Sequence, residues 1–524
     1  MIRLFDSMTQ RKEEFVPREA GKVGIYCCGP TVYNLVHIGN ARPYVTFAVL
    51  RSWLRHRGYE VTLVENITDV DDKIIDKAAT EGRSAAEVAA EFTQAYHDDM
   101  GRLGDALRPD LEPKATETIA EIIDLCCTLI DRDLAYTADG SVYFKVRAFP
   151  DYGKLSRQRI EDLEEGARVA AEPGKRDPLD FAVWKAAKEG EPAWESPWGT
   201  GRPGWHIECS AMGLRYLGPG FDIHGGGRDL IFPHHENEIA QSEAAGLPFA
   251  RYWMHNGMIR TEGAKMAKSV GNIFLLREVL DRYGDEAHKD APVVMTYFLT
   301  THYRSPLEFS VTRLDEARAS YERLADAVRD IDFRLSAADG ATAGRHEAFS
   351  ARVEAATQAF ADAMDDDLNT AAALDELFGL VGDLHRYLGE VDQGATPLDA
   401  DALRAARATL VESCALLCIR LPEASETVVT TVGTVAGTAA GDCSTGHVAL
   451  PPADRLAAEG RWDDLELVYA ERLDCGDPSF AVALRDHYRG AKDWSSSDRV
   501  RDALQGAGFE VRDTPQGTQV VKRD

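Results

Sequence analysis

The order of apolar runs between residues 23 and 65 limits the fold more than any other feature of this chain. Val23–Cys28 is an apolar run that Gly29 and Pro30 break, and Glu60–Glu65 is a second run of strand-forming residues. Between these runs, residues 37–54 have helical spacing. A strand, a loop, a helix and a second strand in this order predict a doubly wound nucleotide-binding sheet, with ligands at the carboxyl ends of its strands.

Later segments predict further parts of the fold. Phe221–His224 predicts another strand, which leads into three glycines where a phosphate or ribose can approach the backbone. From about Val311 the apolar spacing is purely helical and predicts a helical bundle. Residues 423–454 are rich in Thr, Gly and Ala and predict a linker, and residues 497–505 and 509–512 predict a helix and a strand of a small terminal domain.

Composition narrows the class of protein. The chain has 524 residues, and no apolar stretch approaches the roughly 18 residues that a membrane span needs. Its start, residues 1–6, lacks the apolar core of a signal peptide. Nine cysteines, an odd number with two adjacent pairs, argue against a secreted disulfide framework. We therefore expect a multidomain cytoplasmic protein with reduced thiols and no membrane partner.

The charge balance argues against a nucleic-acid partner. The formal net charge is −28 and the isoelectric point is about 4.9, whereas phosphate binding normally leaves a basic footprint. In residues 485–524 the charges are nearly balanced, with eight Lys or Arg against seven Asp or Glu. Composition alone does not suggest RNA binding, which would need a local cationic face.

Four separate positions suggest a metal site. Cys28 ends the first predicted strand, Cys209 lies far along the chain, and His234 and Glu238 have the i, i+4 spacing that places both on one helix face. Two thiolates, an imidazole and a carboxylate suit Zn²⁺. Spacing alone is weak evidence, because the two cysteines fit no compact zinc-finger pattern. The rival ligands that the spacing leaves open are Cys27, His224 and His235.

Two short motifs indicate nucleotide chemistry. His37-Ile38-Gly39-Asn40 lies where the first helix should begin, so side chains at i and i+3 can face a phosphate together with free helix N–H groups. Lys265-Met266-Ala267-Lys268-Ser269 supplies two cations. Activation of a carboxylate by ATP depends on positioning and on stabilising phosphoryl charge, which calls for such donors, a lysine and Mg²⁺.

These motifs, in this order, resemble the paired ATP-binding motifs of class I aminoacyl-tRNA synthetases. Around the metal candidates, the chain resembles the cysteinyl-tRNA synthetase family nearly residue for residue. The matching segments include Tyr26-Cys27-Cys28-Gly29-Pro30-Thr31-Val32-Tyr33, Trp205-His206-Ile207-Glu208-Cys209-Ser210 and His234-His235-Glu236-Asn237-Glu238. The resemblance covers residues 20–420 densely and 485–518 well.

The resemblance implies an α/β fold: a class I synthetase Rossmann-like catalytic domain with an insertion, then an α-helical bundle and a small mixed α/β C-terminal domain. The implied ranges are 1–115 and 201–255 for the two catalytic halves, 116–200 for the insertion, 256–308 for a stem-contact region with the lysine loop, 309–422 for the bundle, 423–454 for the linker and 455–524 for an anticodon-binding domain.

The resemblance also implies roles for particular residues. One zinc ion per chain is held by Cys28, Cys209, His234 and Glu238. ATP with Mg²⁺ is bound by His37, Gly39, Asn40, Gly226, Asp229, Lys265 and Lys268, of which His37, Asn40, Lys265 and Lys268 are catalytic. The substrate cysteine is lined by Gly29, Thr31, Thr68, Trp205 and His224. The anticodon is read by Arg489, Trp494, Asp498 and Asp513.

Two residues depart from the family pattern, which usually has His at position 40 and Ser at position 267. Asn40 still donates a hydrogen bond, so we expect a modest effect, and Ala267 should tune the closure of its loop. For Trp494 the alternative is a core position in the small terminal domain.

The expected activity is ATP-dependent formation of cysteinyl-adenylate from L-cysteine and transfer to the 3′-terminal adenosine of tRNA-Cys, by a monomer. Zinc would select cysteine over serine by binding the thiolate, because an apolar pocket separates near-isosteres poorly. Two alternatives remain: a ligase that joins cysteine to a small amine in amino-sugar thiol biosynthesis, and an inactive tRNA-binding paralogue.

Overall fold

A computed structural model describes residues 1–162, 174–261, 264–265, 274–283, 291–337, 344–422, 479–490, 492–514 and 517–522. Lys268 and the linker expected at 423–454 lie outside the described residues. The chain divides into two compact units, Met1–Asp326 with Glu347–Leu384 and Ala405–Leu421, and Ala327–His346 with His385–Arg404 and Pro422–Asp524.

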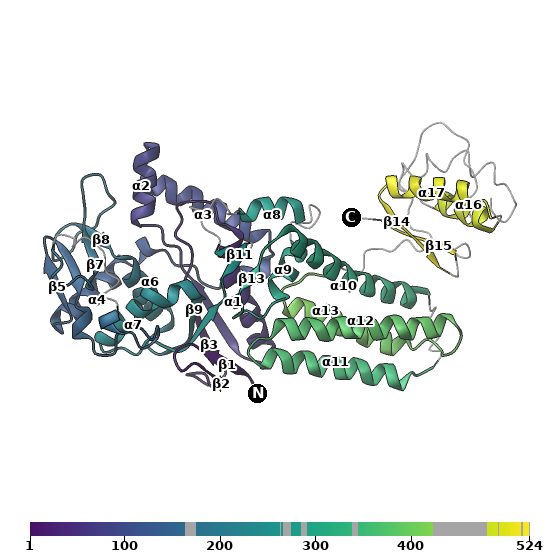
Figure 1. The fold of residues 1–524 in the computed structure, drawn as a ribbon, viewed down its shortest axis with the longest axis horizontal. Coiled ribbons are helices and arrows are strands. Elements are labelled where there is room, and N and C mark those ends of the chain that lie inside the picture. The colour runs from purple at the N-terminus through teal and green to yellow at the C-terminus, as the bar shows by residue number, and fades with distance from the viewer. Residues whose placement is uncertain are drawn as a thin grey trace. The chain divides into compact units, whose positions relative to one another are not determined.

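A four-stranded parallel sheet lies in the first unit (Figure 1). Its order is β10-β9-β3-β4, with β3 at Lys22–Cys27, β4 at Glu60–Glu65, β9 at Phe221–Gly227 and β10 at Ala250–Asn256. Helix α1 (Ile38–His56) connects β3 to β4 and buries Val45, Leu50 and Trp53. The predicted parallel sheet is therefore confirmed. The strand order reverses between β3 and β9, which is where doubly wound sheets bind ligands.

Several short elements surround this sheet. The hairpin β1 (Arg3–Asp6) and β2 (Arg11–Glu14) is antiparallel. After β4 come α2 (Asp72–Glu81), α3 (Ala85–Gly101) and the turns η1 (Asp105–Leu107) and η2 (Ala115–Glu117). Helix α6 (Trp205–Leu217) precedes β9. The turns η4 (Arg228–Leu230) and η5 (Ile231–His235) then lead into α7 (Glu236–Ala244).

The insertion has its own antiparallel sheet, in the order β5-β6-β7-β8. It contains α4 (Ile119–Asp131), β5 (Ala135–Ala138), β6 (Ser141–Phe144), η3 (Val146–Ala148), β7 (Phe181–Ala186) and β8 (Gly201–Pro203). Its buried core includes Phe144 and Trp184 together with Ile207 of α6 and Ala240 of α7. This shared core anchors the two helices that carry the functional side chains described below.

After β10 the chain forms the three-stranded sheet β12-β11-β13 and then long helices. The elements are β11 (Ile259–Thr261), β12 (Ala264–Lys265), α8 (Leu276–Tyr283), α9 (Pro292–Leu299), β13 (Leu307–Glu308), α10 (Val311–Ala337), α11 (Glu347–Asp365), α12 (Thr370–Asp392) and α13 (Ala400–Leu416). Within the first unit, Arg352 of α11 donates to Asp383 of α12. The predicted succession of helices after Val311 is confirmed.

The C-terminal elements are α16 (Ser479–Gly490), α17 (Trp494–Gly506) and the antiparallel pair β14 (Phe509–Thr514) and β15 (Gly517–Lys522). Their core includes Val482, Val500, Leu504 and Phe509. Helix α17 begins earlier than predicted, because Asp493 caps it by accepting a hydrogen bond from the backbone N–H of Ser496 at 3.2 Å. None of the described helices is long and apolar enough to cross a membrane.

Candidate metal centre and nucleotide site

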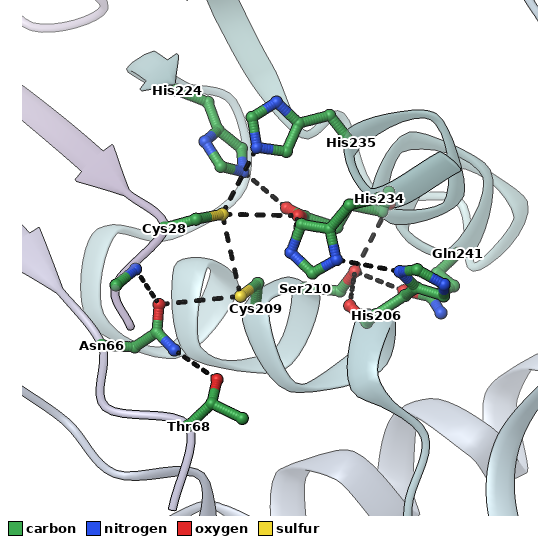
Figure 2. A network of polar contacts seen from close by, with 12 residues as sticks. Cys28, Asn66, Thr68, His206, Cys209, Ser210, His224, His234, His235 and Gln241 are labelled. Carbon is green, nitrogen blue, oxygen red and sulfur yellow. Dashed lines mark hydrogen bonds and ion pairs between the residues drawn. The ribbon is translucent and has the colours of Figure 1, made fainter. Parts of the chain in front are cut away.

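Four side chains from separate segments converge where β3 and β9 end (Figure 2). Cys28 follows β3, and its backbone N–H donates to the carbonyl of Gly225 at 3.2 Å. Cys209 lies in α6, His234 in η5 and Glu238 in α7. Their donor atoms lie within 4.8 Å of one another, and all four side chains are buried. The structure thus brings together the four residues that the resemblance selects as ligands.

The local structure around His234 differs from the single helix expected there. His234 lies in a π-helical turn in which Phe232 has the extended angles φ −138° and ψ 134°, and only then does α7 begin. Even so, His234 Nε2 lies 2.9 Å from Glu238 Oε1. Ser210 of α6 donates to Gln241 of α7 at 2.6 Å, which fixes the two ligand-bearing helices to each other.

The donor set fits a zinc ion. In a tetrahedral site with Zn–S bonds of about 2.3 Å, two sulfur ligands lie about 3.8 Å apart. Cys28 Sγ lies 3.8 Å from Cys209 Sγ and 3.6 Å from Glu238 Oε1. Two thiols, an imidazole and a carboxylate are also ligand types that zinc takes in proteins. The residues present therefore match zinc in both chemistry and spacing.

The four side chains shift one another's pKa values. A hydrogen bond from Cys28, aided by His234, lowers the pKa of Cys209 to about 6 although burial opposes this. Burial disfavours the His234 cation, but Glu238 and Cys209 outweigh it and raise the His234 pKa to about 10. Burial raises the pKa of the Cys28 thiol. Burial opposes ionisation of Glu238, but His224 and His234 hold its pKa well below the usual value.

The structure separates the rival ligands into two kinds. Cys27 Sγ contacts the carbonyl of Cys28 at 3.8 Å and belongs to neither group of described residues that could hold an ion. His224 and His235, by contrast, form a second buried group with Cys28 and Glu238. Geometry alone therefore leaves two overlapping ligand sets.

Hydrogen bonds distinguish these two sets. A histidine that binds a metal through Nε2 almost always donates its Nδ1–H to another group. His234 Nδ1 lies 2.9 Å from His206 Nδ1, which can accept such a bond. His224 Nδ1 is buried without a hydrogen-bond partner among the described residues, so its proton belongs on Nε2, 2.5 Å from Glu238 Oε2. These contacts favour the set with Cys209 and make His224 a donor to Glu238.

Three of the expected substrate residues lie at the ends of β3 and β4. Gly29 donates its backbone N–H to Asn66 Oδ1 at 2.9 Å, and Asn66 Nδ2 donates to Thr68 Oγ1 at 3.1 Å. Thr31 pairs with Thr68 as an isolated β-bridge. A Cβ atom at Gly29 would lie 1.6 Å from the backbone oxygen of Asn66, so only glycine fits. Asn66 Oδ1 also lies 3.7 Å from Cys209 Sγ, which joins these residues to the ligand set.

The other two expected substrate residues contact the ligand set directly. The Trp205 ring stacks on His234, with centroids 4.3 Å apart. His224 donates to Glu238, as described above, and its ring stacks on Trp253 at 4.7 Å. Two of the five residues expected around the substrate therefore contact the ligands, and the other three are linked to Cys209 through Asn66 and the Thr31–Thr68 bridge.

The first nucleotide motif lies at the start of α1. His37 is the N-cap, and its backbone N–H donates to Asn40 Oδ1 at 3.1 Å. A Cβ atom at Gly39 would lie 2.9 Å from the His37 ring. The backbone N–H of Ile38 donates to the carbonyl of Phe274 at 3.0 Å. The chain that returns from the second motif therefore pairs with the first motif.

The second nucleotide motif follows β11. Lys265 ends β12, which pairs with β11, while Lys268 lies outside the described residues. Gly226 is a buried position at the end of β9, where a Cβ atom would meet Leu230 at 2.9 Å. Asp229 is exposed in η4. The roles of these four residues in ATP binding stay predictions.

The expected anticodon residues lie in the C-terminal elements. Trp494 is the first residue of α17 and is 58% exposed, so it is not a core residue. Asp498 lies one turn later, is exposed, and pairs with Arg501 at 3.0 Å. Arg489 is partly buried in α16, and Asp513 lies in β14, its side chain outside those described. Their contact with RNA stays a prediction.

Sequence reasoning missed several residues that support the ligand set. Asn66 follows the predicted strand 60–65 directly, a position where ligand-facing side chains occur, so this signal was available. His206, His255 and Ser7 gave no such signal, because only the folded chain brings His206 to His234 and joins Ser7 and His255 to His235.

Comparison with known proteins identifies relatives over the whole chain. The family model described as the tRNA synthetases class I (C) catalytic domain matches residues 14–319, and the DALR domain matches residues 359–421. A cysteine–tRNA ligase of Desulforamulus reducens is 43% identical, and the match covers 100% of this chain and 100% of that protein. A cysteine–tRNA ligase of Maridesulfovibrio salexigens is 44% identical over 98% of this chain and 99% of its own.

Solved structures support the fold. A Mycobacterium tuberculosis methionyl-tRNA synthetase in complex with methionyl-adenylate has a TM-score of 0.56 at 16% identity, covering 76% of this chain and 89% of its own. An Agrobacterium radiobacter K84 LeuRS, in a ternary complex, has a TM-score of 0.57 at 12% identity, covering 77% of this chain and 85% of its own. The catalytic-domain match over more than half of the chain and the full-length relatives together show that this chain belongs to the cysteine–tRNA ligase family of class I tRNA synthetases.

Proposed function

We propose that the chain activates L-cysteine with ATP to form cysteinyl-adenylate and transfers the cysteine to the 3′-terminal adenosine of tRNA-Cys. The observation that carries this proposal is the buried group of Cys28, Cys209, His234 and Glu238, with donor atoms within 4.8 Å of one another. It occurs in a chain whose full-length relatives are named cysteine–tRNA ligase. We further propose that the protein acts as a cytoplasmic monomer.

The four ligands would hold one zinc ion. When bound, zinc supplies a Lewis acid that takes a thiolate readily and the hydroxyl of serine poorly. This matters because an apolar pocket separates near-isosteres by only about a hundredfold. Trp205 stacks on His234 and would shield this ligand from water on one side. Thr31 and Thr68, which hold the ends of β3 and β4 together, would position the substrate beside the ligands.

The ATP site would lie at the start of α1. The positive end of this helix favours phosphate, and His37 and Asn40 stand at its start. The carboxylate oxygen of cysteine attacks the α-phosphorus, and pyrophosphate leaves in line. Lys265 and Lys268, with Mg²⁺, would offset the charge of the triphosphate, and Gly226 and Asp229 would contact the nucleoside. The pairing of Ile38 with Phe274 supports this arrangement, because it holds the second motif's segment against the first.

The C-terminal elements would recognise the tRNA anticodon. An exposed tryptophan can stack on an unpaired base, and carboxylates accept hydrogen bonds from base amino groups. Trp494 and Asp498 are both exposed and one helical turn apart, which supports this role for them. Arg489 and Asp513 would complete the set.

The test is charging of a tRNA-Cys transcript by the purified chain with ATP and either cysteine or serine, before and after zinc removal. We expect charging with cysteine only, lost on removal and regained when zinc is added back. Cys209→Ser should lose zinc and charging, whereas the control Cys127→Ser, at a partly exposed position in α4, should keep both. Cysteine-dependent pyrophosphate exchange without charging would indicate a ligase for a small amine, and absence of both activities would indicate an inactive paralogue.

A further inference from the structure

A line of three buried hydrogen bonds connects Ser7, through His255 and His235, to Cys28. Ser7 Oγ lies 2.8 Å from His255 Nδ1, and His255 Nε2 lies 2.8 Å from His235 Nδ1. His235 Nε2 lies 3.4 Å from Cys28 Sγ, and Figure 2 shows this last contact. Ser7 is 6% exposed, His255 3% and His235 0%. Every ring nitrogen of the two histidines is therefore used within the line.

The line has one consistent arrangement of protons when Cys28 is a metal ligand. A thiolate only accepts hydrogen bonds, so His235 must carry its proton on Nε2 and donate it to Cys28. His235 Nδ1 must then accept from His255 Nε2, and His255 Nδ1 must accept from the hydroxyl of Ser7. The tautomer of His235 that the thiolate requires is thus matched by His255 and Ser7, which can complete the line in this direction and contact none of the four ligands.

A donor to Cys28 meets an electrostatic need of this site. Two thiolates and a carboxylate exceed the charge of a divalent ion by one, and the thiolate of the substrate would add another negative charge. All four ligands are buried, where an excess of charge is costly without hydrogen-bond donors. His224 supplies such a donor to Glu238 at 2.5 Å, and His235 supplies one to Cys28. The opposite tautomer of His235 would instead aim a lone pair at the sulfur.

We propose that Ser7 and His255 are positioning residues that fix His235 as the N–H donor to the Cys28 thiolate. Through this bond they lower the electron density on the sulfur and strengthen the binding of the substrate thiolate by the same ligand set. This inference rests on the proposed zinc site, and it assigns a function to three residues that the reaction itself does not use.

The test uses the full-length protein loaded with cobalt(II), whose thiolate-to-metal absorption band reports the electron density on the sulfur. In His255→Phe, which keeps a ring and removes both nitrogens, we expect the band to move to lower energy. We also expect cobalt release to a chelator to become about 10- to 100-fold more favourable, as for other losses of an outer hydrogen bond at a metal site. His255→Gln keeps a donor and an acceptor and should restore the band.

Ser7→Ala should produce a smaller shift in the same direction. Its matched control is Ser242→Ala, because the Ser242 hydroxyl is also buried but has no hydrogen-bond partner among the described residues. Cysteine added to the cobalt protein should enlarge the band with half-saturation at a higher concentration in His255→Phe and Ser7→Ala than in the control. Should His255→Phe not fold, Ser7→Ala against Ser242→Ala carries the test.

The experiment distinguishes failure of the proposed metal site from failure of the inference alone. A wild-type protein that shows no thiolate band with cobalt(II) would overturn the proposed metal site, and the inference with it. A wild-type band that is unchanged in His255→Phe and Ser7→Ala would overturn the inference alone. A loss of affinity that His255→Gln does not restore, without a band shift, would mean that His255 has only a packing role, and this too would overturn it.

Discussion

Zinc uptake by the metal-free chain should release two protons per ion at pH 8. Metal binds ionised thiols and neutral imidazole, so each ligand that carries a proton must lose it. Burial keeps Cys28 protonated by raising its pKa, and Glu238 and Cys209 raise the pKa of His234 to about 10. Cys209, with a pKa lowered to about 6, and Glu238, with a depressed pKa, have already lost theirs. Two protons therefore leave from these four ligands.

The number of released protons determines how strongly, and in which direction, zinc affinity changes with pH. Each released proton makes zinc binding about tenfold tighter per pH unit, so two protons give about a hundredfold per unit, or about ten-thousandfold between pH 7 and pH 9. Below pH 6 the thiol of Cys209 is protonated as well, and the dependence should steepen to about a thousandfold per unit. Zinc affinity should therefore fall as the pH falls, most steeply in acid.

Calorimetric titration of zinc into the metal-free chain, in buffers that differ in protonation enthalpy, measures the number of protons directly. A control is the thiolate absorbance of the metal-free chain at pH 7, which should decrease in Cys209→Ser and stay unchanged in Cys127→Ser. Release of three protons at pH 8 would mean that Cys209 is still a thiol there. Release of one or none would mean that Cys28, His234 or both had already lost their protons, and either result would refute the charge assignment.

Three further predictions concern other parts of the molecule. Trp494→Ala should leave the free energy of unfolding within about 0.5 kcal/mol, because this side chain is 58% exposed, but should raise the KM for tRNA about tenfold or more without changing pyrophosphate exchange. Glu236→Gln should lower the free energy of unfolding by about 1–3 kcal/mol in urea titrations, because the buried carboxylate accepts backbone N–H groups of the 153–156 turn at 2.9 and 2.7 Å. Gly29→Ala should cost about 1–3 kcal/mol or more and weaken zinc retention, since its Cβ would lie 1.6 Å from a carbonyl oxygen of Asn66; normal retention would contradict the packing argument.

Local pattern was sufficient to place three of the four strands of the parallel sheet. The second predicted strand, Glu60–Glu65, has the same bounds as β4, and the first differs from β3 by one residue at each end. Such runs are readable because burial on both faces of a parallel sheet requires continuous apolar residues. The strand β10 went unpredicted, and so did β15. The single helix expected around His234 is divided into η5 and α7, a detail that i, i+4 spacing does not encode.

Contacts between distant segments could not be derived from spacing. Cys27 and Cys28 are adjacent, so their side chains point to opposite faces of a strand. This alternation does not show which of the two side chains contacts Cys209. The resemblance selected Cys28, and the structure places its sulfur 3.8 Å from that of Cys209. His224 and His235 remained rivals in the structure too. Only their hydrogen bonds, to Glu238 and to His255, distinguish a supporting role from direct ligation.

The topology would allow one short segment to serve both the thiol and the phosphates in the proposed reaction. Strand β3 lies between β9 and β4, so the chain that leaves it borders both crossovers of the sheet. That chain begins with Cys28, bonded to Gly225 of β9, and ends at His37, which starts α1. Between these points, Thr31 pairs with Thr68 at the end of β4 and holds the segment in place. Cysteine has its sulfur and its carboxylate at opposite ends of a small molecule, so the proposed sulfur site at the start of this segment and the proposed ATP site at its end would suit the activation of this amino acid.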